Sequence, residues 1–154
     1  MKNVNAAQLA LRTEPILLEV LMQRFRAVAE EMGYALQRTG YTAFVNETAD
    51  LGVALVTPEG EIFGYPVSIG ISMFDNLDFG AVIRSMDSYD EGDAVFYNDP
   101  YTTAGVASHL PDVNMLAPVF HGGNLVCFAF AYVHSTDIGG NVPGSLSPSH
   151  REVF

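Results

Sequence analysis

The feature that most constrains the fold of this chain is a pair of apolar runs separated by a Gly-Gly turn. The runs occupy residues 113–133, and His121-Gly122-Gly123-Asn124 lies between them. Glycine accepts the left-handed backbone that tight turns need, so the pattern predicts a β-hairpin. A hairpin returns the chain to its starting point, and residues 108–112 and 134–137 should therefore lie at the same end of a sheet.

Each end of this hairpin carries a histidine and, a few positions later, an aspartate. His109 and Asp112 precede the first strand, and His134 and Asp137 follow the second. Imidazole and carboxylate groups are ligands that suit zinc, manganese and ferrous iron. Pro111 argues against a helix here, but residues this close in a turn can still converge on one ion. We therefore predict that His109, Asp112 and His134 bind one divalent metal ion (Zn, Mn or Fe).

Two further aspartates are candidates for the same site, each with an alternative role. Asp50 could complete the metal shell, or it could be a solvated loop acid. Asp137 is a candidate catalytic residue that could orient a metal-bound imidazole by accepting its second N–H. Its alternative role is to cap the turn before Gly139-Gly140, whose N–H groups could themselves face an anionic intermediate.

The run Asn98-Asp99-Pro100-Tyr101 also has two interpretations. It is most simply a turn, because Asn and Asp-Pro favour turn initiation. In the functional interpretation, Asp99 is a second candidate catalytic residue and lines the site entrance with Tyr101.

No Gly-rich run is followed by Lys-Ser or Lys-Thr, so we do not expect this chain to bind a nucleotide.

The remaining pattern predicts an α+β fold. Apolar residues recur every three or four positions in 13–37 and predict a long N-terminal helix with one buried face, capped by Thr13 and ended by Gly40. Residues 51–56 and 61–65 predict two strands joined by a Pro-Gly turn, 73–86 show weaker helical spacing, and 93–97 predict a short strand. A helix followed by strands favours hairpins in a mixed or antiparallel sheet. The apolar residues of the predicted helix face are Leu17, Leu21, Phe25, Val28, Met32 and Leu36.

Composition excludes some functions and indicates a compartment. The chain is 49% apolar, only 16% charged, and carries a net charge of −11. The low charged fraction suggests a surface covered by a partner, while the acidic balance argues against nucleic acid and anionic membranes as partners. The single cysteine, Cys127, lies in an apolar run and has no partner for a disulfide. Because no signal peptide or membrane span is visible either, we expect a cytoplasmic location.

Several motifs occur together in one order and at one spacing. They are Asn98-Asp99-Pro100-Tyr101, His109-Leu110-Pro111-Asp112, His134-Ser135-Thr136-Asp137-Ile138-Gly139-Gly140 and Pro143-Gly144-Ser145, preceded by Arg38-Thr39, Glu47-Thr48-Ala49-Asp50 and Gly60. This pattern resembles the hydantoinase B family, which includes alpha subunits of acetone carboxylase and part of 5-oxoprolinase. Members are several-fold longer, so the resemblance implies that residues 13–154 are the N-terminal metal-binding segment of a larger multidomain fold. From the sequence pattern itself, we expect residues 1–12 to be a flexible arm.

The resemblance also implies a function. The matching positions in the family hold a divalent metal in an ATP-dependent, multisubunit enzyme. Such an enzyme hydrolyses a cyclic amide of the hydantoin, oxoproline or lactam type, or carboxylates a ketone, after a hydantoinase A-like partner subunit that holds ATP and Mg has phosphorylated the small-molecule substrate. The isolated chain would then be inactive without that partner and the remainder of its own subunit. The alternative is a non-catalytic structural or interaction fragment of such a complex.

Overall fold

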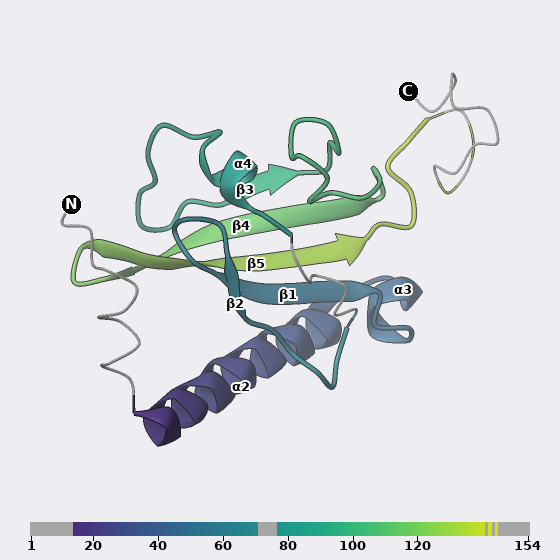
Figure 1. The fold of residues 1–154 in the computed structure, drawn as a ribbon. Coiled ribbons are helices and arrows are strands. Elements are labelled where there is room, and N and C mark those ends of the chain that lie inside the picture. Colours follow the sequence, from purple (N-terminus) through teal and green to yellow (C-terminus); the bar gives the residue numbers. More distant parts are fainter. Residues whose placement is uncertain (1–13, 71–76, 141, 143, 145–154) are drawn as a thin grey trace.

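The computed structural model describes residues 14–70, 77–140, 142 and 144. Its centre is a five-stranded sheet in the order β2-β1-β5-β4-β3, in which every neighbouring pair is antiparallel (Figure 1). A long helix lies against one side of this sheet, and a short helix with its flanking loops covers the other. The α+β prediction is confirmed, while the proposed arm at 1–12 lies outside the described residues.

The predicted hairpin is the longest paired element of the sheet. Strand β4 (Asp112–His121) pairs with β5 (Asn124–His134) along its whole length, and His121 opposes Asn124 at the turn. Gly122 and Gly123 have φ angles of 58° and 78°, which is the left-handed backbone that the sequence predicted. The other predicted strands are also present, as β1 (Leu51–Val56), β2 (Ile62–Gly64) and β3 (Val95–Tyr97).

The long helix, α2 (Pro15–Thr39), matches the predicted helix, with Pro15 in its first turn and Gly40 just beyond its end. The predicted cap, Thr13, lies outside the described residues, and the observed N-cap residue Glu14 makes no side-chain capping bond. The helix packs against β1 and β2. Gly33 is buried at this contact, and a Cβ atom there would lie 2.7 Å from Cγ2 of Ile69, so an added side chain would force a neighbour to shift.

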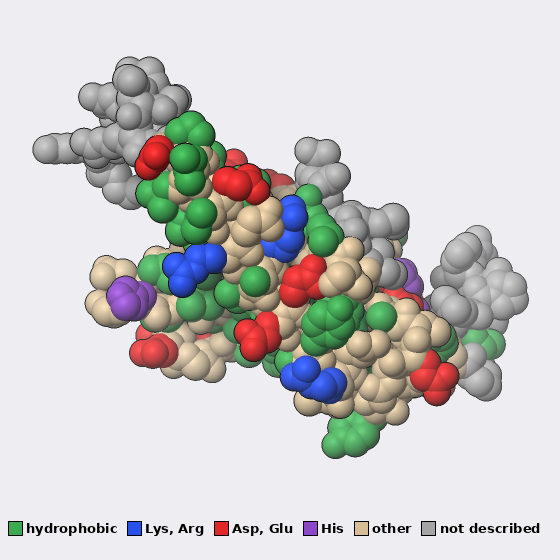
Figure 2. All heavy atoms as spheres, turned by 90° about the horizontal axis from the view of Figure 1, so that it is seen from below, with side chains coloured by type: hydrophobic (Ala, Val, Ile, Leu, Met, Phe, Trp, Pro, Cys, Tyr) green, Lys and Arg blue, Asp and Glu red, His purple; other side chains and the backbone are tan. Residues whose placement is uncertain are grey.

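The prediction of one buried face on this helix is wrong for its first half. Leu17, Leu21, Phe25 and Val28 are between 37% and 50% exposed, whereas the buried residues of α2 are Ala29 and Gly33. Periodicity reports an apolar stripe, but it does not report whether the same chain covers that stripe. Figure 2 shows hydrophobic side chains gathered on the surface over the first part of α2.

Two short helices complete the fold. Helix α3 (Ala43–Asn46) was not predicted; Thr42 caps it by accepting a bond from the Val45 N–H. Helix α4 (Gly80–Ile83) is much shorter than the helical spacing at 73–86 predicted, although residues 71–76 lie outside the described part of the chain. In the part of the chain that the structure describes, no helix has the combination of length and apolar composition that a membrane span requires.

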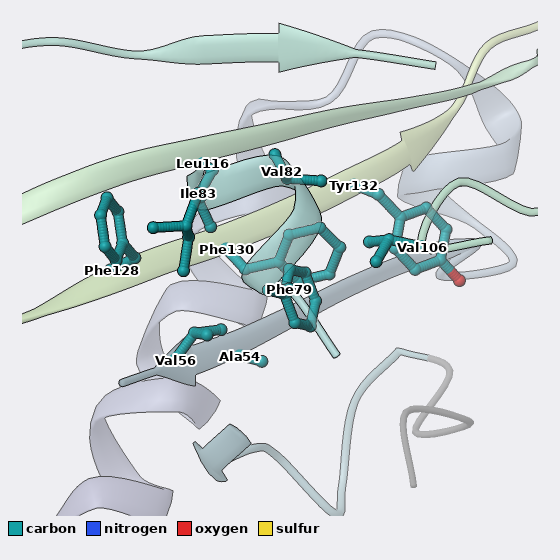
Figure 3. Packing of buried hydrophobic residues seen from close by; sticks show 10 residues of the cluster. All are labelled: Ala54, Val56, Phe79, Val82, Ile83, Val106, Leu116, Phe128, Phe130 and Tyr132. Atoms are coloured by element: carbon teal, nitrogen blue, oxygen red, sulfur yellow. The ribbon is translucent and has the colours of Figure 1, made fainter. Parts of the chain in front are cut away.

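The main core lies between α4 and the sheet (Figure 3). Phe79, Val82 and Ile83 pack there against side chains from β1, β4 and β5, and the rings of Phe79 and Phe130 meet edge to face at 4.7 Å. We call this side of the sheet the inner face. The inner-face residues of the strands in this cluster are Ala54, Val56, Leu116, Phe128, Phe130 and Tyr132.

Candidate metal centre

Three adjacent strands bring polar residues into one row at the end of the inner face. Asp112 opens β4 and pairs with His134, the last residue of β5. On the other side, the backbone N–H of His134 donates to the carbonyl of Asp50, which immediately precedes β1, at 3.2 Å. Paired residues of antiparallel strands project to the same face, so Asp50, His134 and Asp112 form one row. The hairpin therefore does what the sequence predicted, returning His134 to the start of β4.

The carboxylate of Asp112 lies between two imidazoles. Its Oδ1 is 2.9 Å from Nδ1 of His134, and its Oδ2 is 3.3 Å from Nδ1 of His109. Asp112 is buried and the His134 side chain is only 13% exposed, whereas the His109 side chain is 47% exposed. One potential ligand atom from each of these residues lies within 4.8 Å of the other two. This donor set of two imidazoles and a carboxylate fits zinc, manganese or ferrous iron.

The loop that carries His109 is held by its backbone. Each carbonyl of residues 109–111 accepts a hydrogen bond, from the Asp112 N–H at 3.1 Å, the Asn98 side-chain amide at 3.0 Å and the Ser135 N–H at 2.8 Å, respectively. The bond from Asn98 ties the loop to the residue that follows β3, and the bond from Ser135 ties it to the residue that follows β5. The loop is thus fixed between two strand ends, and Asn98 has a positioning role that the sequence interpretation missed.

Ser108 is a second residue that the sequence interpretation missed. Its hydroxyl lies 2.7 Å from Nδ1 of His109 and donates to Oδ2 of Asp112 at 3.3 Å. The hydroxyl therefore links the exposed imidazole to the buried carboxylate and restricts the orientation of the His109 ring. Ser108 sits directly beside a predicted ligand, and that adjacency was the signal available in the sequence.

Helix α3 positions the opposite side of the row. The Phe44 ring meets the His134 ring at 5.1 Å and at 74°, an edge-to-face contact. The carbonyl of the same residue accepts the N–H of Asp50 at 2.8 Å, and Ala49 just before it has a φ of 53°. Phe44 consequently helps to orient both His134 and Asp50, and only the unpredicted helix brings it there.

Asp50 lies at the edge of the cluster. Its Oδ2 is 4.0 Å from Nδ1 of His134, and its side chain is 30% exposed. Burial raises the pKa of the Tyr132 phenol, one row further into the sheet, and the negative charges of Asp112 and Asp50 raise it further. Both carboxylates therefore contribute negative potential to this end of the inner face, which favours a cation.

Asp137 is used by the backbone of its own turn. Its Oδ1 accepts the N–H of Gly139 at 2.7 Å and its Oδ2 accepts the N–H of Gly144 at 3.2 Å. This is the capping alternative of the sequence interpretation, and it directs the Gly139 N–H toward Asp137 rather than toward an anionic ligand. Asp137 is not a member of the three-residue cluster found among the described residues.

Asp99 also caps a turn. Its Oδ1 accepts the N–H of Tyr101 at 2.9 Å, and its carbonyl accepts the Thr103 hydroxyl at 2.7 Å. The bond from Tyr101, together with bonds from Thr102, lowers the pKa of the Asp99 carboxyl group. Tyr101 itself is 93% exposed. The run 98–101 thus has the turn conformation that was its simpler interpretation, and Asp99 is likewise outside the cluster.

Among the described residues, the remaining histidine and the cysteine lie outside the cluster. His121 is exposed in the hairpin turn, at the opposite end of β4 from Asp112. Cys127 is unpaired and half-buried, which raises the pKa of its thiol. His150 lies outside the described residues.

A family model described as hydantoinase B/oxoprolinase matches residues 14–154. The chain belongs to this family. It is 35% identical over 144 residues to a 5-oxoprolinase of Dictyostelium discoideum, covering 91% of this chain and 11% of that protein. It is 34% identical over 149 residues to the B-type component of a putative D-/L-hydantoinase of a Pseudomonas species, covering 87% of this chain and 23% of that protein.

Two solved structures of similar proteins contain the same fold. The ATP-dependent caprolactamase of Pseudomonas jessenii superposes with a TM-score of 0.65 at 31% identity, over 87% of this chain and 23% of that one. Acetone carboxylase superposes with a TM-score of 0.74 over 88% of this chain and 19% of that one, and at 23% identity this likeness concerns the fold alone. Against the two curated relatives named above, the chain spans only about a tenth to a quarter of their length.

Proposed function

We propose that this chain is the metal-binding part of an ATP-dependent hydantoinase B-type enzyme. The relatives are named for reactions on cyclic amides, such as 5-oxoproline and caprolactam, and for the carboxylation of acetone. These substrates share a carbonyl group that must be activated. We infer that this chain acts on an activated carbonyl compound, either by hydrolysis of a cyclic amide or by carboxylation of a ketone.

The observation that carries the proposal is the cluster of His109, Asp112 and His134. We assign these residues as ligands of one Zn, Mn or Fe ion, and Asp50 to the outer part of the same site because its Oδ2 lies 4.0 Å from His134 Nδ1. Such an ion would polarise the substrate oxygen or lower the pKa of a bound water molecule.

The residues of the chain have separate tasks in this proposal. Asp112 holds both imidazoles at hydrogen-bonding distance or close to it, so the donor groups are already assembled. Ser108 and Phe44 restrict the His109 and His134 rings, respectively. Preassembly matters because the energy needed to order the ligands is then provided by folding rather than by binding. Asp99 and Asp137, the candidate catalytic residues, shape two loops near the strand ends.

ATP would be bound elsewhere in the enzyme. Relatives are named as the B-type component of a hydantoinase and the beta component of a caprolactamase, which indicates enzymes of more than one subunit. We propose a hydantoinase A-like subunit as the site of ATP and Mg, and the remainder of a hydantoinase B-type subunit as a second partner. The rival function, a structural fragment without chemistry, predicts that the chain has no specific metal site.

The experiment that separates these functions is a metal titration of the purified chain. Isothermal titration with Mn²⁺ and Zn²⁺ should give one site per chain, and His109→Ala combined with His134→Ala should weaken it by at least about 100-fold, because two of three ligands are lost. His121→Ala is the matched control, since it removes an exposed imidazole at the far end of the same hairpin. Equal affinities in all three proteins would reject the proposal.

A further inference from the structure

The side of the sheet opposite the inner face is only half covered. In β1 every residue is buried, whereas in β4 buried and half-buried residues alternate from Asp112 to Pro118. The half-buried positions of β4 and β5 pair with one another in register, so they lie on one face. We call these six residues the outer face: Val113, Met115, Ala117, Ala129, Ala131 and Val133.

The outer face is apolar throughout. Its six side chains include no charged or hydrogen-bonding group. It continues onto β3, where Phe96 pairs with Met115 and is 66% exposed. An apolar surface that extends across three strands is typical of an interface rather than of a surface that faces water.

Helix α2 shows what kind of element covers this side. Leu51, Val53 and Leu55 of β1 pair with Val133, Ala131 and Ala129, so they continue the outer face onto the neighbouring strand. These β1 residues are buried, and α2 packs over them, with Gly33 next to Val53. Over the outer face of β4 and β5 the described residues provide no corresponding long helix, and the short helix α3 meets β5 at His134.

The dimensions of the open half suit one more helix. Three strands at a spacing of about 4.8 Å cover about 10 Å, which is close to the diameter of an α-helix with its side chains. Ala117, Ala129 and Ala131 have short side chains, so the open half offers a shallow surface on which a helix can lie. A helix lying here beside α2 could also contact apolar side chains of α2 that are now exposed, such as Leu21 and Val28.

We propose that a helix from the remainder of a hydantoinase B-type subunit packs on the outer face beside α2. The remainder is the favoured occupant because the same fold makes up only 23% and 19% of the caprolactamase and acetone carboxylase chains, which contain much more polypeptide than this chain. The inference rests on the subunit assignment in the proposed function but not on the metal site. A chain that binds metal and leaves the outer face uncovered would contradict this inference alone.

The test uses the caprolactamase beta polypeptide from which the segment matching this chain has been deleted, co-expressed with this chain. We expect the two polypeptides to co-purify. Ala131→Glu, which places a charge at the centre of the outer face, should reduce the recovered complex at least tenfold. His121→Glu adds the same charge at the hairpin turn and should leave the yield unchanged. Circular dichroism of each isolated variant establishes that it is folded.

A second measurement needs no substitution. Cys127 follows the outer face along β5, where it pairs with Val119, and it is the only cysteine of the chain. Its alkylation by N-ethylmaleimide should be at least tenfold slower in the purified complex than in the isolated chain.

Three results would each overturn the inference: no complex with the wild-type chain, a complex that Ala131→Glu does not affect, or a wild-type dimer that Ala131→Glu dissociates, which would assign the face to a second copy.

Discussion

The polar cluster at the open end of the β4–β5 hairpin and the outer face of the same two strands differ in how far this chain alone satisfies their contacts. At the end, both oxygens of Asp112 have an imidazole beside them, and the loop bearing His109 is tied down at three successive carbonyls. On the outer face, Ala117, Ala129 and Ala131 have no described helix over them. The polar site is therefore assembled by contacts within this chain, whereas the apolar face needs other polypeptide.

This difference separates two properties of the isolated chain, its affinity for metal and its tendency to associate. The bonds among Ser108, Asp112 and His134, and the bond from Ser135 to Pro111, join residues of the hairpin and its two ends, so they form when the hairpin forms. Apolar burial depends on area, and a small chain buries a smaller fraction of its surface than a large one does. We therefore expect the isolated chain to bind metal, although it should be inactive and should tend to associate.

The largest effect should come from Asp112, the residue that joins the two imidazoles. Asp112→Ala removes one ligand and leaves Nδ1 of His134 without its closest partner, so we expect Mn²⁺ and Zn²⁺ affinity to fall by at least about 100-fold in isothermal titration. Asp137→Ala is the comparison, because Asp137 bonds to Gly139 and Gly144 in its own turn. A loss of less than threefold is expected there; similar losses in the two variants would show that the site is wrongly assigned.

A smaller effect should follow from a substitution that weakens the attachment of the loop at residues 109–111 and leaves the proposed ligands unchanged. Asn98→Ala removes the amide that donates to the Leu110 carbonyl, and we expect about a tenfold loss of metal affinity because the loop bearing His109 then keeps only two of its three bonds. Asn124→Ala, in the hairpin turn, removes an exposed amide and should have no effect on affinity. If Asn98→Ala binds metal as the wild type does, the loop is held well enough by its backbone bonds.

The covered and open halves of this side of the sheet can be compared by adding methyl groups to a side chain in each half. Gly33→Ala under the covered half places a Cβ 2.7 Å from Ile69, and we expect a net loss of about 1 kcal/mol in the free energy of unfolding, although alanine favours the helix by about the same amount. Ala131→Val in the open half should change it by less than about 0.5 kcal/mol. Urea denaturation of both variants measures the difference, and equal losses would mean that the open half is already packed.

The smallest effect concerns the attachment of α2. The Glu30 carboxylate accepts the Ser68 hydroxyl and the N–H groups of Val67 and Ser68, and these bonds lower the pKa of Glu30 below its usual value. A carboxyl group whose pKa is lower in the folded than in the unfolded chain stabilises the folded chain. This stabilisation is fully present at a pH above the pKa of the unfolded chain and is lost as the pH falls through the pKa of the folded chain. Urea midpoints of wild type and Glu30→Gln should therefore differ at pH 7 and converge as the pH falls through the lowered pKa of Glu30. A constant difference over this range would exclude the linkage.

The parts predicted from sequence are those that neighbours in the chain determine. The hairpin follows from apolar runs around Gly122-Gly123, and the clustering of His109, Asp112 and His134 follows once the hairpin is accepted. The exposure of α2 was not predictable, because periodicity identifies an apolar stripe whatever covers it. Helix α3, Ser108 and Asn98 were missed because their roles depend on contacts with the strand ends or on side-chain orientation, which a pattern of residues does not specify.

The most direct measurement of the central claim is a crystal structure of the chain grown with Zn²⁺, with diffraction data collected on both sides of the zinc absorption edge. We predict one strong anomalous peak between the side chains of His109, Asp112 and His134, and its loss in crystals of Asp112→Ala. A peak at His121 alone, or no peak at all with the cluster geometry unchanged, would contradict the account.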